Sequence, residues 1–260
     1  MSVRTIAAVP VFSGKSTPGT EHVNHDRWGA VNRTAWVIDG ATRTSSAPIS
    51  NYVASLDAAL TAHAADDSLS LSELLASAIA QIAADYSGTN VSATVAMARQ
   101  RPHGGWDWLV LGDSAVAYAD ENGTHLIQDT RLACVGVAQR ARKRAIELNE
   151  LDGAHLKDAK AALLAAEDAA RNVRGGFWVA ADRPDAAMHA VTGSTSAEDL
   201  VLMTDGVFSG FAAETWDDAE QMVHDVLHAG PEHVLQNVHR DVMTAHGRAD
   251  DMTLVHAHAS

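Results

Sequence analysis

The sequence predicts a single α+β domain in which antiparallel sheets carry helices on their outer faces. Segments with strand character mostly follow one another along the chain, which is typical of antiparallel sheets. Helical patterns occur in separate blocks between those strands. The 260 residues contain no internal repeat and no long linker rich in proline or serine, so one domain over residues 1–260 fits better than two.

The N-terminal part alternates between apolar and polar stretches. Residues 3–12 are apolar and predict a first strand. Residues 13–26 are polar and contain glycine and proline, which predicts a loop. The alternation in residues 27–39, followed by an apolar run, predicts one or two further strands.

Two helices follow. Residues 49–60 place their apolar side chains at helical spacing, with Pro48 near the start. Ser70 and Glu73 have the spacing of a capping box, in which each side chain binds the other residue's backbone amide. Apolar residues within 74–86 then continue one helical face, so a second helix begins after Ser70.

The middle of the chain returns to strands and then changes composition. We expect strands within residues 90–100, 106–120 and 123–129. Residues 139–171 are rich in Ala, Lys, Arg and Glu, and predict helix with an interruption at Gly153.

The C-terminal part predicts a short irregular stretch and four regular elements. Residues 175–193 carry glycine and proline breakers and predict irregular structure. Gly230 ends one amphipathic helix and Pro231 opens the next. The regular elements are a buried strand, two helices and a closing strand, at 198–205, 213–230, 231–247 and 251–259.

Composition excludes several functional classes. The formal net charge of −14 disfavours nonspecific binding to nucleic acid or to an anionic membrane. The longest apolar runs fall short of a membrane span, and the N-terminus has no apolar signal-peptide region, so we expect a cytosolic protein. A single cysteine, Cys134, cannot form a disulfide framework within the chain. The oligomeric state stays open.

Acidic residues recur at the ends of apolar runs. Asp39, Asp113 and Asp205 each end such a run next to a glycine, and Asp250 and Asp251 precede the last one. One aspartate at a strand end is as often a turn or helix cap as a functional group. Several buried together are costly unless cations neutralise them, and carboxylates suit Mg²⁺ and Mn²⁺. The repetition therefore favours a shared metal site.

Six short motifs occur in the order found in one enzyme family. They are Asn24-His25-Asp26, VIDG, SATVAM, LGDSAVAY, LMTDG and DDMTLV. Together they resemble the metal-dependent type 2C (PPM) serine/threonine protein phosphatases over roughly the whole chain. The resemblance implies a central antiparallel β-sandwich flanked by helices on both sides, a four-layer αββα fold. It also implies a phosphorylated protein as substrate, and a variable helical or flap insert at about 139–193.

The resemblance assigns roles to the acids. Asp39 matches the carboxylate that bridges two metal ions, and the carbonyl of Gly40 would bind one of them. Asp205 and Asp250 match ligands of the other ion. Asp113 matches an acid that helps to hold a third ion in many bacterial members. The cofactor would be two or three Mg²⁺ or Mn²⁺ ions.

The implied reaction is hydrolysis of a phosphoserine or phosphothreonine monoester. In such a site a hydroxide bridging two metal ions attacks phosphorus in line, so no cysteine or serine nucleophile is needed. Asp26 matches an acid that positions the attacking water. The family's phosphate-binding arginine is replaced by Glu21, and we expect Arg43 to supply that charge, with Lys15 and Arg27 as further candidates.

Two alternatives stay open. Glu21 and the altered loop Ala41-Thr42-Arg43 are compatible with a pseudophosphatase that acts as a regulatory binding module. Cys134 and Arg140 fit the spacing C-x₅-R of cysteine-dependent phosphatases, in which a thiolate attacks phosphorus.

Overall fold

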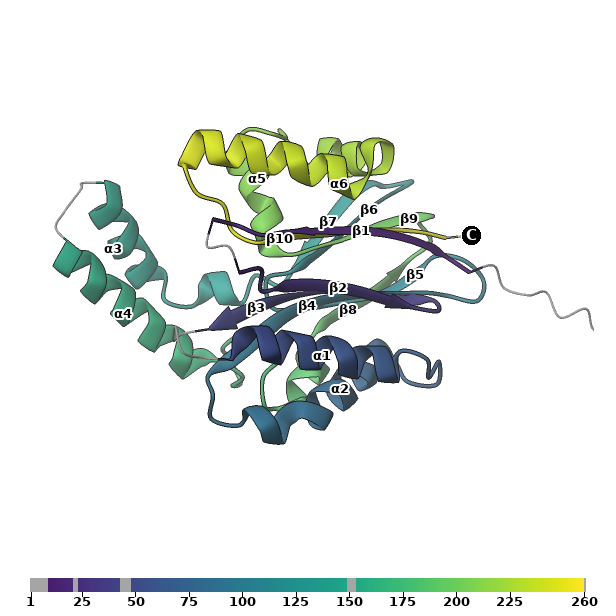
Figure 1. Cartoon of the computed structure of the whole chain (residues 1–260), viewed down its shortest axis with the longest axis horizontal. Coiled ribbons are helices and arrows are strands. Elements are labelled where there is room, and N and C mark those ends of the chain that lie inside the picture. The colour runs from purple at the N-terminus through teal and green to yellow at the C-terminus, as the bar shows by residue number, and fades with distance from the viewer. Residues whose placement is uncertain (1–8, 21–22, 43–47, 149–152, 260) are drawn as a thin grey trace, which may run out of the picture.

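The computed structural model describes residues 9–20, 23–42, 48–148 and 153–259. Two five-stranded antiparallel sheets are stacked face to face, and helices cover the outer face of each (Figure 1). The predicted α+β fold with four layers is therefore confirmed.

The first sheet has the strand order β1-β10-β9-β6-β7. Its strands, in that order, are Val11–Thr17, Met252–His258, Asp199–Met203, Ala115–Asp120 and Gly123–Gln128. The second sheet has the order β2-β3-β4-β5-β8. Its strands are Asp26–Val31, Thr34–Thr42, Val91–Gln100, Trp106–Leu111 and Val191–Thr195.

Each sheet has its own helical cover. Helices α1 and α2, Ile49–His63 and Leu71–Tyr86, lie on the second sheet (Figure 1). Helices α5 and α6, Ser209–Ala212 and Ala219–His246, lie on the first. Helices α3 and α4, Val137–Leu148 and Gly153–Ala170, pack on each other and project beside the sandwich. Three short 3₁₀ helices, η1 to η3, span Leu132–Cys134, Pro184–His189 and Asp205–Phe208.

Three apolar layers hold the sandwich together. Trp36, Leu56 and Leu75 are fully buried in the layer between the second sheet and its helices. The layer between the sheets includes Val37 and Trp106 from the second sheet, with residues of β9 and β10 from the first. A third layer lies between the first sheet and α6. Alternate residues of each inner strand thus face opposite layers, which fixes the strand register.

Local signals read from the sequence are confirmed at two points. Ser70 and Glu73 form the reciprocal capping box that begins α2. Gly230 has a φ of 79° and breaks α6 just before Pro231, so this helix consists of two segments with a kink between them. A residue with positive φ interrupts a right-handed helix, and glycine adopts that conformation without steric cost.

Two predictions about strands were wrong. Strand β1 covers Val11–Thr17, so the polar stretch expected to be a loop is an edge strand paired with β10. Strand β8, Val191–Thr195, lies at the edge of the second sheet, at the end of a segment expected to be irregular. Edge strands are covered on fewer sides, so they carry polar residues and lose the apolar pattern that identifies inner strands.

Among the described residues, no helix combines the length and the apolar character that a crossing of the bilayer requires.

Candidate metal centre

Three of the predicted acids meet at one end of the sandwich. Asp39 lies near the end of β3, Asp113 in the turn after β5, and Asp205 at the start of η3, directly after β9. One carboxylate oxygen from each lies within 4.8 Å of the other two. The site is therefore built from both sheets, which brings together residues separated by up to 166 positions in the chain.

The turn that carries Asp113 depends on glycine. Gly112 has a φ of 79°, and a Cβ atom there would lie 2.6 Å from the side chain of Thr94. Thr94 is itself buried and its hydroxyl is 2.6 Å from that of Ser114. A larger residue at position 112 would therefore be strained in its backbone and would push Asp113 away from β4.

Asp26 lies directly opposite Asp39 in the pairing of β2 with β3. It is only 4% exposed, and its Oδ2 accepts a 2.7 Å hydrogen bond from the hydroxyl of Thr204. The backbone amide of Thr253 in turn donates to the Thr204 hydroxyl oxygen at 2.9 Å. This chain of bonds ties the second sheet to β9 and β10 of the first, immediately beside Asp205.

The two neighbouring acids before β10 have different roles. Asp250 is exposed and lines the same pocket as Asp39, Asp113 and Asp205. Asp251 instead accepts hydrogen bonds from the backbone amides of Gly19, at 2.8 Å, and His25, at 2.6 Å. Asp251 thus fastens the loop that leads into Asp26. The sequence analysis singled out Asp250 and missed the structural role of Asp251, because its partners lie more than 220 residues away.

Burial and mutual repulsion raise the pKa values of these carboxyl groups. Burial raises the pKa of Asp39 well above its ordinary value, and the charges of Asp205, Asp26 and Asp113 add to the effect. For Asp26, burial is the main cause of a pKa of about 7, and for Asp205 of about 6. Burial also raises the pKa of Asp113. A bound divalent cation would offset this repulsion, and oxygen ligands in this number suit Mg²⁺ or Mn²⁺.

The pocket around the acids has a volume of about 280 Å³. Gly40 lines it, and a Cβ atom at that position would lie 2.6 Å from Val53 and 2.9 Å from the carbonyl oxygen of His25. Position 40 therefore requires glycine for the close approach of α1 and of the His25 loop to β3. This packing constraint adds to the role in metal binding that the sequence analysis gave to its carbonyl.

An arginine that the sequence analysis did not single out lies on the wall of this pocket. Arg171 follows the last residue of α4 and shares the pocket with Asp39 and Asp205. Its guanidinium makes 3.5 Å hydrogen bonds to the carbonyl and side-chain oxygens of Asn90. In the sequence, Arg171 is one of several cations in a helical stretch, and nothing local separates it from the others. Glu21 and Arg43 lie outside the described residues.

The geometry around Cys134 does not form a phosphate cradle. The cysteine is exposed at the end of η1. The guanidinium of Arg140 donates to the carbonyl oxygens of Val135 and Leu132 and pairs with Glu167 at 2.5 Å. These bonds hold the guanidinium of Arg140 on protein acceptors. It is therefore not placed to bind a phosphate next to the thiol of Cys134.

A second group of possible metal ligands lies at the far end of β10. Asp199 Oδ1 is 2.7 Å from His256 Nε2 and 2.8 Å from His258 Nδ1. Nothing in the local sequence links these histidines with Asp199. They meet because residues two apart on a strand share a face and His258 lies opposite Asp199 in the register.

The fold is that of known PPM-type phosphatases. The chain superposes on the serine/threonine phosphatase PstP/Ppp of Mycobacterium tuberculosis with a TM-score of 0.64 and 13% identity, covering 97% of this chain and 100% of that one. For the PPM Ser-Thr phosphatase MsPP of Mycobacterium smegmatis, solved with cacodylate, the TM-score is 0.57 and the identity 17%, covering 98% of this chain and 100% of that one. For the PstP catalytic domain solved with two manganese ions, the TM-score is 0.57 and the identity 14%, covering 96% of this chain and 98% of that one. No protein-family model and no curated protein sequence matches the chain.

The neighbouring acids Asp250 and Asp251 provide a matched pair of variants. We expect Asp251→Ala to lower the free energy of unfolding by about 2 kcal/mol, because two hydrogen bonds from backbone amides to a partly buried carboxylate are lost. Asp250→Ala, at an exposed position, should change it by less than about 0.5 kcal/mol. Urea unfolding in EDTA measures both values, and equal losses in the two variants would contradict the different roles assigned here.

The raised pKa values predict how stability depends on pH when divalent cations are removed. Between about pH 4 and pH 7 the folded chain holds protons on Asp26, Asp39 and Asp205 that the unfolded chain has already released. The folded state binds more protons, so its stability falls as pH rises through this range. We expect the melting temperature in EDTA to be several degrees lower at pH 7.5 than at pH 5.

Two controls separate this effect from the general charge of the protein. Asp39→Asn removes one of the interacting carboxylates, so the fall in melting temperature between pH 5 and pH 7.5 should shrink. Added Mn²⁺ should raise the melting temperature of the wild type at pH 7.5 much more than at pH 5, where protons compete for the same oxygens. An equal fall with pH in the wild type and in Asp39→Asn would refute the prediction.

Proposed function

We propose that this protein is a metal-dependent phosphoserine/phosphothreonine protein phosphatase. The observation that carries the proposal is the convergence of Asp39, Asp113 and Asp205, within 4.8 Å of one another, in a fold shared with PPM-type phosphatases. Such a cluster is unfavourable by itself and becomes favourable once divalent cations neutralise it. The manganese ions in the PstP structure belong to a protein of the same fold, and they support a Mg²⁺ or Mn²⁺ cofactor here.

Some residues of the pocket would bind cations, and others would bind the substrate. Asp39, Asp113, Asp205 and Asp250 would hold two or three cations with their carboxylates, and Gly40 with its carbonyl oxygen. When bound, such ions lower the pKa of water and neutralise phosphoryl oxygens.

Asp26 would orient a water molecule and accept its proton. Its Oδ2 accepts a hydrogen bond from the Thr204 hydroxyl, and its place opposite Asp39 in the pairing of β2 with β3 supports this role. A base with a pKa near neutrality is suited to proton transfer under physiological conditions.

Arg171 is the described arginine best placed to bind the phosphate group. Arg171 lines the pocket, and the hydrogen bonds of its guanidinium to Asn90 are long, at 3.5 Å, so it can exchange them for charge-assisted bonds with phosphoryl oxygens at small cost. Arg43 stays a prediction for the same role. The substrate would be a phosphorylated protein, and a cytosolic location stays an expectation from the sequence.

The proposed activity is tested with a phosphoserine peptide. We expect hydrolysis to require Mn²⁺ or Mg²⁺, to stop in EDTA and to be insensitive to a thiol-blocking reagent. Asp39→Asn and Asp205→Asn should each lower kcat by at least about a hundredfold, because each removes a charge from the cation site. Phosphate release against time measures the rates.

The control is the behaviour of the same variants as folded proteins. Both should keep the circular dichroism spectrum and the cooperative unfolding of the wild type in EDTA. Hydrolysis that persists in EDTA would overturn the metal-dependent mechanism. A wild-type protein that binds Mn²⁺ and a phosphopeptide but does not hydrolyse it would favour the pseudophosphatase alternative.

The two arginine candidates can be compared directly. Arg171→Ala should lower kcat/KM for the phosphopeptide by about one to two decades, since one charge-assisted contact to the phosphate is lost. Arg174→Ala, three residues further on at an exposed position, is the matched control and should leave kcat/KM unchanged. Arg43→Ala tests the prediction from the sequence. Normal kcat/KM in Arg171→Ala together with a loss in Arg43→Ala would assign the phosphate to Arg43 instead.

A further inference from the structure

Three possible metal ligands meet on the first sheet, away from the acid pocket. Asp199 Oδ1 lies 2.7 Å from His256 Nε2 and 2.8 Å from His258 Nδ1, and one ligand atom of each residue lies within 4.8 Å of the other two. We call these three residues the histidine cluster. It lies near the end of β10, whereas Asp250 precedes the start of that strand. A strand rises about 3.4 Å per residue, so roughly 15–20 Å of β10 separates the cluster from the acids.

The pairing of β9 with β10 places all three side chains on one face of the sheet. His258 lies directly opposite Asp199, and His256, two residues earlier on the same strand, shares its face. On that face, Leu254 and Val201 continue toward the apolar layer under α6. Both strands are inner strands of the first sheet, with β1 and β6 as their outer neighbours. The ligands are therefore held on a rigid part of the fold, as a metal site requires.

Glu198 adds a second carboxylate beside the histidine cluster. Its Oε1 lies 3.7 Å from His258 Nε2, the ring nitrogen that does not face Asp199. The backbone of Glu198 is fixed, because its carbonyl oxygen accepts hydrogen bonds from the amide of Ala259 at 2.8 Å and from the indole nitrogen of Trp106 at 3.2 Å. A carboxylate at the far nitrogen of a ligating histidine orients the ring and makes it a stronger ligand.

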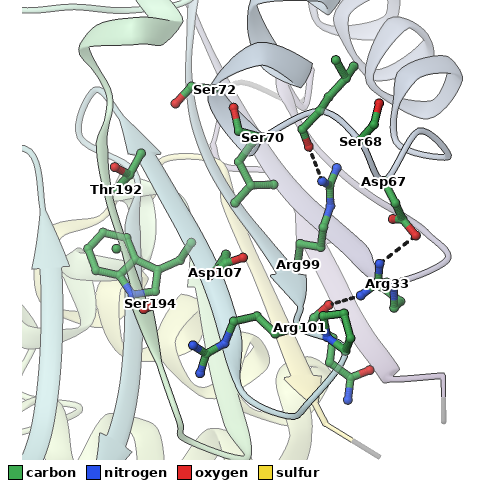
Figure 2. Close-up of a pocket in the computed structure, with 16 residues that line it drawn as sticks. Arg33, Asp67, Ser68, Ser70, Ser72, Arg99, Arg101, Asp107, Thr192 and Ser194 are labelled. Atoms are coloured by element: carbon green, nitrogen blue, oxygen red, sulfur yellow. Dashed lines mark hydrogen bonds and ion pairs between the residues drawn. The ribbon is translucent and has the colours of Figure 1, made fainter. Parts of the chain in front are cut away.

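The partners of Asp199 differ in kind from those of other carboxylates in this protein. Asp67, in a pocket of about 580 Å³ on the second sheet, pairs with Arg33 at 2.7 Å (Figure 2), and Asp129 pairs with Arg131. An arginine keeps its proton and has no lone pair for a metal, so such pairs are complete in themselves. Imidazole is neutral at physiological pH in its ordinary state, and each neutral ring offers one nitrogen lone pair to a metal ion.

The distances within the histidine cluster are close to those of an occupied site. In a tetrahedral zinc site, with bonds of about 2.0–2.1 Å to nitrogen and oxygen, neighbouring ligand atoms lie about 3.3 Å apart. The two nitrogens would therefore move away from Asp199 Oδ1 by about 0.5 Å. The side chains of His256, His258 and Asp199 are 20%, 42% and 30% exposed, which leaves room for this movement and for a water molecule as the fourth ligand.

We propose that the histidine cluster is a second metal site, which binds Zn²⁺ through His256 Nε2, His258 Nδ1 and Asp199 Oδ1. The ion would replace the protons that form the two hydrogen bonds to Asp199, and it would link β9 to the end of β10 through side chains. Imidazole nitrogens suit Zn²⁺, whereas Mg²⁺ and Mn²⁺ prefer oxygen ligands such as those of the acid pocket. The two sites would therefore take different ions.

The test is a titration of the full chain with Zn²⁺ in excess Mg²⁺, in which the ring resonances of the histidines are followed by NMR. These resonances report on the cluster itself, whatever ion the acid pocket holds. We expect the rings of His256 and His258 to shift together and to saturate with one Kd. His256→Ala and Asp199→Asn should each weaken the Kd read from the His258 ring at least tenfold, because one of three ligands is lost. Circular dichroism checks that both variants stay folded.

Two exposed histidines provide matched controls. His103→Ala lies in the β4–β5 turn, and His228→Ala removes one ring of the stacked pair that His224 and His228 form on α6. Both variants should keep the Kd of the wild type.

Three outcomes would each overturn the proposal. They are the absence of saturable shifts of the His256 and His258 rings, an unchanged Kd in His256→Ala, and loss of the shifts in His228→Ala. Shifts of the same size with Mg²⁺ alone would contradict the preference for Zn²⁺. The titration involves no hydrolysis, so its result is independent of the proposed activity.

Discussion

The repulsion among carboxylates at one end of the sandwich is the constraint on which the functional site depends. Asp39, Asp113 and Asp205 come from three separate segments and from both sheets, and each loses hydration where it lies. No local interaction would bring these charges together. The packing of three apolar layers supplies the free energy that holds them, and a bound divalent cation would relieve the repulsion that results.

The hydrogen bonds around the acids are as important for the site as the acids themselves. Thr204 joins Asp26 on the second sheet to β10 on the first, and Asp251 fastens the loop that enters β2. These bonds fix the relative position of the two sheets at the site, where a shift of 1 Å would change the coordination of an ion. Asp250 and Asp251 are neighbours with the same side chain. Asp250 lines the pocket, whereas Asp251 holds the loop beside it.

The helical pair α3–α4 contributes to the wall of the pocket from beside the sandwich. It packs mainly on itself and projects beside the sheets, yet Leu164, Glu167 and Arg171 at its end reach the wall of the metal pocket. A segment attached in this way can change the charge and shape of the pocket while the acids stay at the ends of the strands.

The sequence by itself determined most of the periodic elements, the start of α2, the break within α6 and the acids at the strand ends. Inner strands, the capping box at Ser70, the break at Gly230 and the aspartates at the strand ends all have local signals, because burial and backbone conformation constrain the residue types at those positions. The edge strands β1 and β8 lack that constraint and were not recognised. Only the tertiary structure decided the partners of Asp251, the position of Arg171 in the pocket and the meeting of Asp199 with His256 and His258. Each of these depends on contacts between residues far apart in the chain, and such contacts leave no periodic trace around the residues that make them.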